Sequence, residues 1–132
     1  MQALIHALHA LGMDEFRLDE TQSYHCIFAV SGEELMLTLN VEEQSHTVFL
    51  SVTTSASMKH ECDKAFFMAF SRQAMEPFRG GVGVGVFPES EEISVYNAFS
   101  YIENDSDEIL ALISNVVEKA YEWQMRLIEP AS

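Results

Sequence analysis

Basic residues are scarce in this sequence, and that scarcity excludes two classes of partner. Of 132 residues, 7 are Lys or Arg and 21 are Asp or Glu, so the formal net charge is -14. A nucleic-acid binder needs Lys and Arg gathered in a patch, and an anionic membrane surface attracts the same residues. We therefore expect neither nucleic acid nor a membrane as the partner.

Cysteines and long apolar runs are also few. There are two cysteines, Cys26 and Cys62, and no stretch reaches the ~20 apolar residues that span a bilayer. The N-terminal segment from Met1 to Leu11 contains no Lys or Arg, so it lacks the basic start of a secretory signal. These features predict a cytoplasmic protein in which both thiols stay reduced.

The sequence also lacks a complete motif for phosphate or metal binding. In the glycine-rich run from Gly80 to Gly85, a dinucleotide fingerprint would need glycine next and a P-loop would need lysine, but Val86 follows. No set of ligands has the spacing of a zinc site, and no Gly-x-Ser-x-Gly element is present. We expect no cofactor, no metal and no enzymatic activity.

Apolar residues make up 48% of the chain, enough for the core of one domain that spans residues 1–132. Their periodicity predicts helices over 2–11, 57–75 and from about 105, with Ser57 as the N-cap of the second. Alternation and turn residues predict strands over 24–30, 35–42, 46–53, 81–87 and 93–101. The order αβββαββα indicates an α+β fold in which helices pack on an antiparallel sheet.

Some apolar residues are left over after this core is assigned. On the second helix the apolar stripe is wider than one sheet needs, since Phe67 lies beside Phe66 and Phe70. In the fourth strand the glycines leave one face bare while Val82 and Val84 occupy the other. Apolar side chains also fall on the outer faces of strands: Met36, Phe49 and Tyr96. Such a surplus is typical of a protein that binds partners.

Several segments together resemble a known family. The similar segments are Leu8–Met13, Glu33–Leu39 and Gly80–Glu91, with Trp123 and Leu127 in the last helix. In their order, and in the length and acidity of the chain, they resemble the class I type III secretion chaperones of the Tir-chaperone-like group. The resemblance implies a bacterial, cytoplasmic homodimer without ATPase activity that holds the N-terminal segment of a secreted effector in an extended, secretion-competent form.

The resemblance also implies that the second helix and the fourth strand form the dimer interface. We therefore expect five residues in or near it: Phe66, Phe67, Phe70, Val82 and Val84. For the effector segment we expect pockets beside the first helix and on the outer faces of the sheet, lined by Leu4, Leu8, Met36, Phe49 and Tyr96. An extended segment binds in this way by adding a strand and placing alternate side chains in pockets.

Two other functions remain open at this point. A protein of the same fold could sequester a secretion regulator or another chaperone instead of escorting an effector. A small enzyme or ligand-binding α+β domain would instead show a deep polar pocket with convergent His and carboxylate groups. For Leu4 and Leu8 there is also a second interpretation, because both could simply pack the first helix onto the sheet.

Overall fold

The computed structural model describes residues 1–13, 16–58, 63–87 and 89–128. Its elements have the predicted order αβββαββα, with one additional 3-10 helix, and confirm the α+β fold. The helices are α1 (Gln2–Ala10), α2 (Lys64–Ala74), η1 (Glu76–Arg79, the 3-10 helix) and α3 (Ser106–Ile128). The strands are β1 (Ser23–Val30), β2 (Glu33–Glu42), β3 (Thr47–Ser57), β4 (Gly83–Val86) and β5 (Glu92–Ser100).

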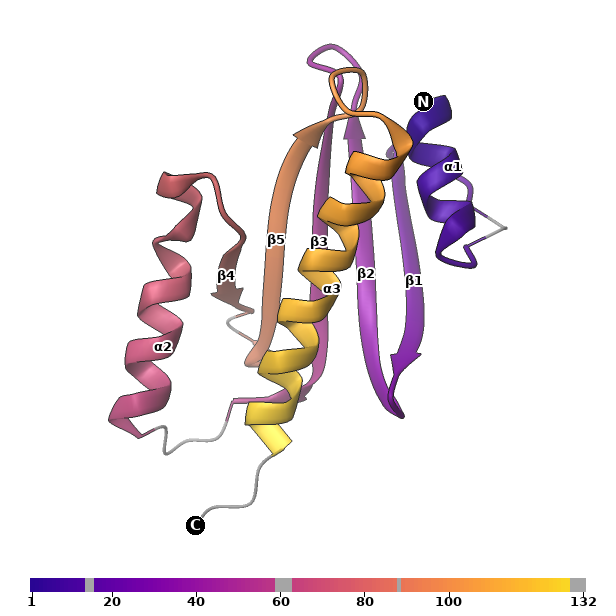
Figure 1. The fold of residues 1–132 in the computed structure, drawn as a ribbon. Coiled ribbons are helices and arrows are strands. Elements are labelled where there is room, and N and C mark those ends of the chain that lie inside the picture. The colour runs from indigo at the N-terminus through magenta and orange to yellow at the C-terminus, as the bar shows by residue number, and fades with distance from the viewer. Residues whose placement is uncertain (14–15, 59–62, 88, 129–132) are drawn as a thin grey trace.

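The strands form one antiparallel sheet in the order β1-β2-β3-β5-β4. The predicted meander is its first half, and β1 and β4 are the two edges. Figure 1 shows α3 lying across one face of the sheet, with α1 beside it over the β1 side. Helix α2 lies next to β4, beyond the other edge (Figure 1). The fold therefore leaves one face of the sheet without a covering helix.

The core lies between the sheet and α3. On β2 the alternate residues from Leu35 to Val41 are buried, and the residues between them are exposed or half-buried. Helix α3 presents a stripe at spacings of three and four residues to these strands, and its members are fully buried: Ile109, Ile113, Val116 and Ala120. The buried side chains that alternate along the strands thus pack against the buried stripe of the helix, and this packing fixes the register of the strands.

The second helix begins later than the sequence predicts. Strand β3 continues to Ser57, which is not an N-cap; its hydroxyl donates to the carbonyl oxygen of Ser90 at 2.7 Å. Asp63 caps the helix instead, and its Oδ1 accepts a hydrogen bond from the N–H of Phe66 at 2.7 Å. Met58, predicted on the helix, lies before it and packs half-buried against the core, and Cys62 falls outside the described residues.

An irregularity in β3 explains why this strand could extend so far. The register between β3 and β5 shifts between Thr53 and Ser57, so the N–H groups of Ser55 and Ala56 need other acceptors. Both donate to Oε1 of Gln124 on α3, at 3.1 Å each. The side chain of one buried helix residue therefore closes the gap in the strand ladder.

Candidate functional site

A groove opens on the helix-covered side of the sheet, beside the free edge of β1. It measures about 890 Å³ and is lined by the C-terminal end of α1, by β1 and by α3. Its lining is mainly apolar and half-buried, with Leu11, Met13, Tyr24, Cys26, Phe28, Val30, Val117 and Tyr121 as the main side chains. Glu118 is the one charged residue among the described residues of the lining.

Strand register explains why this groove is apolar. Tyr24, Cys26 and Phe28 pair with Leu39, Leu37 and Leu35 of β2, so they point to the same face as the core. The short helix α1 covers only part of β1, as Figure 1 shows, so these side chains stay half-buried instead of buried. Within the described part of the chain β1 pairs with β2 alone. An apolar groove thus adjoins an open strand edge, the arrangement that accepts an extended peptide.

The outer face of the sheet carries a second, shallower hollow of about 620 Å³. Phe49 and Tyr96 line it, together with Pro77 after α2, whereas Met36 does not. The exposed fractions are 51% for Phe49, 43% for Tyr96 and 37% for Met36, so all three lie on the outer face as predicted. Their role in partner binding stays a prediction.

Leu4 and Leu8 lie in the core and not on a binding surface. Each has an exposed fraction of 0%, because α1 is oriented with this side against the core. They pack α1 against the core, next to α3, so the interpretation of these leucines as packing residues is the one that their burial supports. Among the residues that line the groove, those of β1 could have been found from the sequence, through the alternation of Tyr24, Cys26 and Phe28.

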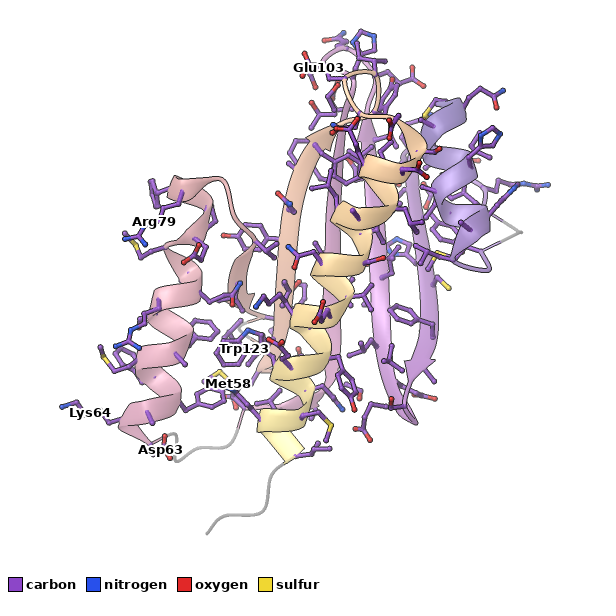
Figure 2. The ribbon with its side chains drawn as sticks, viewed as in Figure 1. Met58, Asp63, Lys64, Arg79, Glu103 and Trp123 are labelled. Atoms are coloured by element: carbon purple, nitrogen blue, oxygen red, sulfur yellow. The ribbon has the colours of Figure 1, made fainter. Side chains whose placement is uncertain are left out.

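Four of the five predicted interface residues make contacts inside the protomer. The rings of Phe66 and Phe70 meet Trp123 edge to face, with centroids 5.4 and 5.7 Å apart. Val82 and Val84 are each 4% exposed. Figure 2 shows the side chain of Trp123 between α3 and α2, where it joins the helix to the body of the fold. The role of these residues in a dimer interface stays a prediction.

Phe67, beside them on α2, is directed to solvent and is 62% exposed. It is accompanied by apolar residues that the sequence analysis did not assign to a surface: Met68, Met75 and Phe78, with exposed fractions of 40%, 59% and 84%. No residue of α2 is buried in the protomer. We refer to Phe67, Met68, Met75 and Phe78 as the outer stripe.

The glycine face of β4 is covered at Gly83 and open at Gly85. Gly83 pairs with Tyr96 of β5, and a Cβ atom at this glycine would overlap the ring of that tyrosine. An aromatic side chain laid over a neighbouring strand glycine stabilises such an edge. The glycine therefore serves the packing of Tyr96 on the outer face, a pairing that the strand alternation alone did not reveal.

Titratable groups do not gather into a reactive centre in the described segments. No group of three or more His, Cys, Asp or Glu side chains in them could hold a metal ion. Asp19 has a pKa below its ordinary value, first because the hydroxyl of Thr21 donates to its carboxylate at 2.6 Å, and also because the backbone N–H of Ser23 does. This carboxylate is exposed and orders the turn before β1, so its role is local.

None of the described helices combines the length and the apolar content that a membrane span requires. A comparison with curated proteins gives no match. Solved structures, by contrast, share the fold at low sequence identity.

Among these structures, a chain of the ExsC-ExsE complex is 17% identical with a TM-score of 0.74, and the match covers 99% of this chain and 94% of that one. A chain of the HopA1-SchA chaperone-effector complex is 15% identical with a TM-score of 0.68, over 94% and 91%. A chain of the heterodimeric ExoU-SpcU complex from the type III secretion system of Pseudomonas aeruginosa is 13% identical with a TM-score of 0.65, over 96% and 98%. Residues 2–124 match the Tir chaperone protein (CesT) family, and the chain belongs to this family.

Proposed function

We propose that this protein is a cytoplasmic chaperone that binds an extended segment of a type III secretion effector in the groove beside β1. The observation that carries the proposal is that an apolar groove of about 890 Å³ lies beside an open strand edge. Similar structures titled as chaperone-effector complexes support the class of partner. Binding is the whole activity in this proposal, and no catalysis accompanies it.

The extended form of the cargo follows from the shape of the site. A strand that pairs with β1 directs alternate side chains toward the groove, where Phe28 and Val117 offer apolar contacts. The remaining side chains point away from it. A net charge of -14 keeps such a complex in solution and repels acidic competitors for the groove.

The test is affinity purification from the source bacterium, with mass spectrometry of the bound proteins and calorimetry with the N-terminal segment of the protein found. Val117→Glu places a charge on the groove wall, and we expect affinity to fall about tenfold or more, as for loss of an apolar anchor. Ile102→Glu, in the exposed turn after β5 and outside both the groove and the predicted partner-binding residues, is the matched control with the same added charge. Melting curves establish that both variants are folded.

Hydrogen exchange of the complex examines the strand itself. We expect slower exchange of the β1 amides on binding and unchanged exchange in β4 at the opposite edge. Equal affinity of the Val117→Glu variant and the wild type, with both folded, would refute the groove. If the purified partner is a regulator and no effector is found, the protein sequesters that regulator instead.

We further propose a homodimer in which the outer stripe of one protomer meets that of the other. The argument is that α2 buries none of its residues in the protomer, although it carries Phe67 and Met68, both exposed. Light scattering should show a dimer for the wild type at micromolar concentration and a monomer for Phe67→Asp. Phe49→Asp, on the outer face of the sheet, is the control and should stay dimeric; a monomeric wild type would overturn the proposal.

A further inference from the structure

The few basic residues of this chain are unevenly placed. The described strands and α1 contain neither Lys nor Arg. Three of the seven basic residues, Arg72, Lys119 and Arg126, line a single groove of about 560 Å³ between α2 and α3. In a chain with a net charge of -14, this concentration gives the groove an electrostatic character unlike that of the surrounding surface.

Helical spacing brings the walls of the groove together. On α3 the lining residues recur every three or four positions: Asn115, Lys119, Glu122 and Arg126. On the other side the wall consists of Ala69, Arg72 and Gln73 of α2 and Glu76 of η1. Val82 and Trp123 lie at the floor of the groove and are each 4% exposed, and Figure 2 shows Trp123 directed from α3 toward α2. The groove thus has polar walls over an apolar, nearly closed floor.

The two arginines keep their hydrogen-bonding capacity. The guanidinium carbon of Arg126 lies 5.2 Å from the centroid of the Trp123 ring, so one face of the group is covered, and its N–H groups make no hydrogen bond or ion pair with another described residue. Lys119 forms an ion pair with Glu122 at 3.5 Å. Within the described residues Arg72 forms no ion pair, and that leaves Glu76 as the other carboxylate of the lining.

The charges of the lining can then be counted. Three cations and two carboxylates give a formal charge of +1 for the groove. Guanidinium groups are planar forks that bind carboxylates through two parallel N–H donors. Because Lys119 and Glu122 satisfy each other, the groups available to a partner are chiefly the guanidiniums of Arg72 and Arg126.

We propose that the α2–α3 groove binds a peptide segment of a partner protein that carries Asp or Glu side chains. The guanidiniums of Arg72 and Arg126 receive its carboxylates, beside the nearly buried ring of Trp123. The groove, with a volume of about 560 Å³ between two helices, is larger than a single small anion needs. Since the remaining surface is strongly acidic, it repels such a segment and so favours its binding in this groove.

This surface is distinct from the groove beside β1. Val117 and Tyr121 line that apolar groove, whereas Lys119 and Trp123 line this one, so α3 separates the two. The proposal therefore does not depend on the identity of the cargo. It concerns a second contact, made through charge, on the side of the molecule where α2 packs.

The experiment uses the full chain and fluorescein-labelled Gly-Ser peptides interrupted by Glu, by Gln or by Lys. Fluorescence anisotropy measures binding, and the emission of Trp123, the single tryptophan of the chain, reports whether the contact is at the groove. We expect saturable binding of the Glu peptide that weakens as salt is added, with a change in Trp123 emission. We expect no comparable binding of the Gln or Lys peptide.

Two double variants with the same change in net charge separate the groove from general electrostatics. Arg72→Gln with Arg126→Gln should weaken binding of the Glu peptide about tenfold or more. Lys64→Gln with Arg79→Gln removes charges at the opposite ends of the α2–η1 segment, away from Trp123 (Figure 2), and should leave affinity within about twofold. Absence of saturable binding, equal loss in both double variants, or equal binding of the Gln peptide would overturn the proposal.

Discussion

Replacing Gln124 with Met removes the amide that fastens the end of β3 to α3, while it keeps the length and bulk of the side chain. Gln124 is 3% exposed and makes four hydrogen bonds. Its Oε1 accepts from the N–H groups of Ser55 and Ala56, and its Nε2 donates to Oε1 of Glu33 at 3.0 Å and to Oγ of Ser55 at 2.9 Å. The variant therefore leaves the irregular part of β3 without acceptors.

The loss of stability follows from the two N–H groups that lose their acceptor. A buried donor without a partner costs about 1–3 kcal/mol. Ser55 is exposed and Ala56 is half-buried, so water reaches both groups in part and the lower half of this range applies. We expect Gln124→Met to lower the free energy of unfolding by about 2–3 kcal/mol. For a chain of this size that corresponds to a melting temperature lower by roughly 6–15 °C.

The assay is thermal and urea unfolding, with Gln124→Glu as the matched variant. This change keeps an acceptor for both N–H groups but places a second carboxylate beside Glu33, and like charges at this distance repel each other. Gln124→Glu should therefore unfold more easily than the wild type although both acceptors remain. If Gln124→Met unfolds within about 0.5 kcal/mol of the wild type, the amide does not hold β3.

Three further changes examine local features. Gly83→Ala forces the ring of Tyr96 aside and should cost about 1–2 kcal/mol in unfolding experiments, but nearly nothing in a Tyr96→Ala background; equal costs in both would contradict the packing. Asp63→Ala removes the N-cap of α2 and should cost that helix about 1 kcal/mol, seen as faster amide exchange confined to α2. Asp19→Asn should make the free energy of unfolding depend less on pH in acid. The hydrogen bond from Thr21 lowers the pKa of Asp19 in the folded state, so the carboxylate stabilises the fold at pH values above its ordinary pKa near 3.9, and this contribution is lost as pH falls. The same pH dependence in the variant and the wild type would refute this.

Elements whose local and tertiary signals agree could be predicted from the sequence. The alternation in β2 and the apolar stripe of α3 demand burial at the same positions that the packed structure buries. The start of α3 was also predictable, because Asp105 and Glu108 form a capping box in which each side chain accepts from the other residue's N–H, at 2.8 and 3.2 Å. Gly12 likewise takes the positive φ of 83° expected after a helix.

The start of α2 could not be predicted because two good caps compete for it. Ser57 and Asp63 both suit an N-cap, and local preference does not choose between them. Contacts distant in sequence decide: the N–H of Met58 donates to the carbonyl oxygen of Glu91 at 2.8 Å, and Gln124 holds the preceding residues in the strand. Those contacts extend β3 and delay the helix.

The candidate site was predicted in part for a related reason. A sequence indicates which residues are apolar, but it does not indicate how far a helix extends over a sheet. The stripe of Leu4 and Leu8 is consistent with either a pocket or a core, and only the seating of α1 decides for the core. For the outward residues Met36, Phe49 and Tyr96 strand alternation was sufficient, because the opposite face is so clearly apolar.

Strand order relates the two proposed contacts of this protein. The groove adjoins β1, whereas α2 and its outer stripe adjoin β4, and the order β1-β2-β3-β5-β4 puts these at opposite edges of the sheet. At about 4.8 Å between strands, four intervals separate the edges by roughly 19 Å. A dimer joined through α2 would therefore leave both β1 edges open. Two identical grooves on one dimer let a single long segment engage both, and the second engagement is then intramolecular, which raises affinity without any new kind of contact.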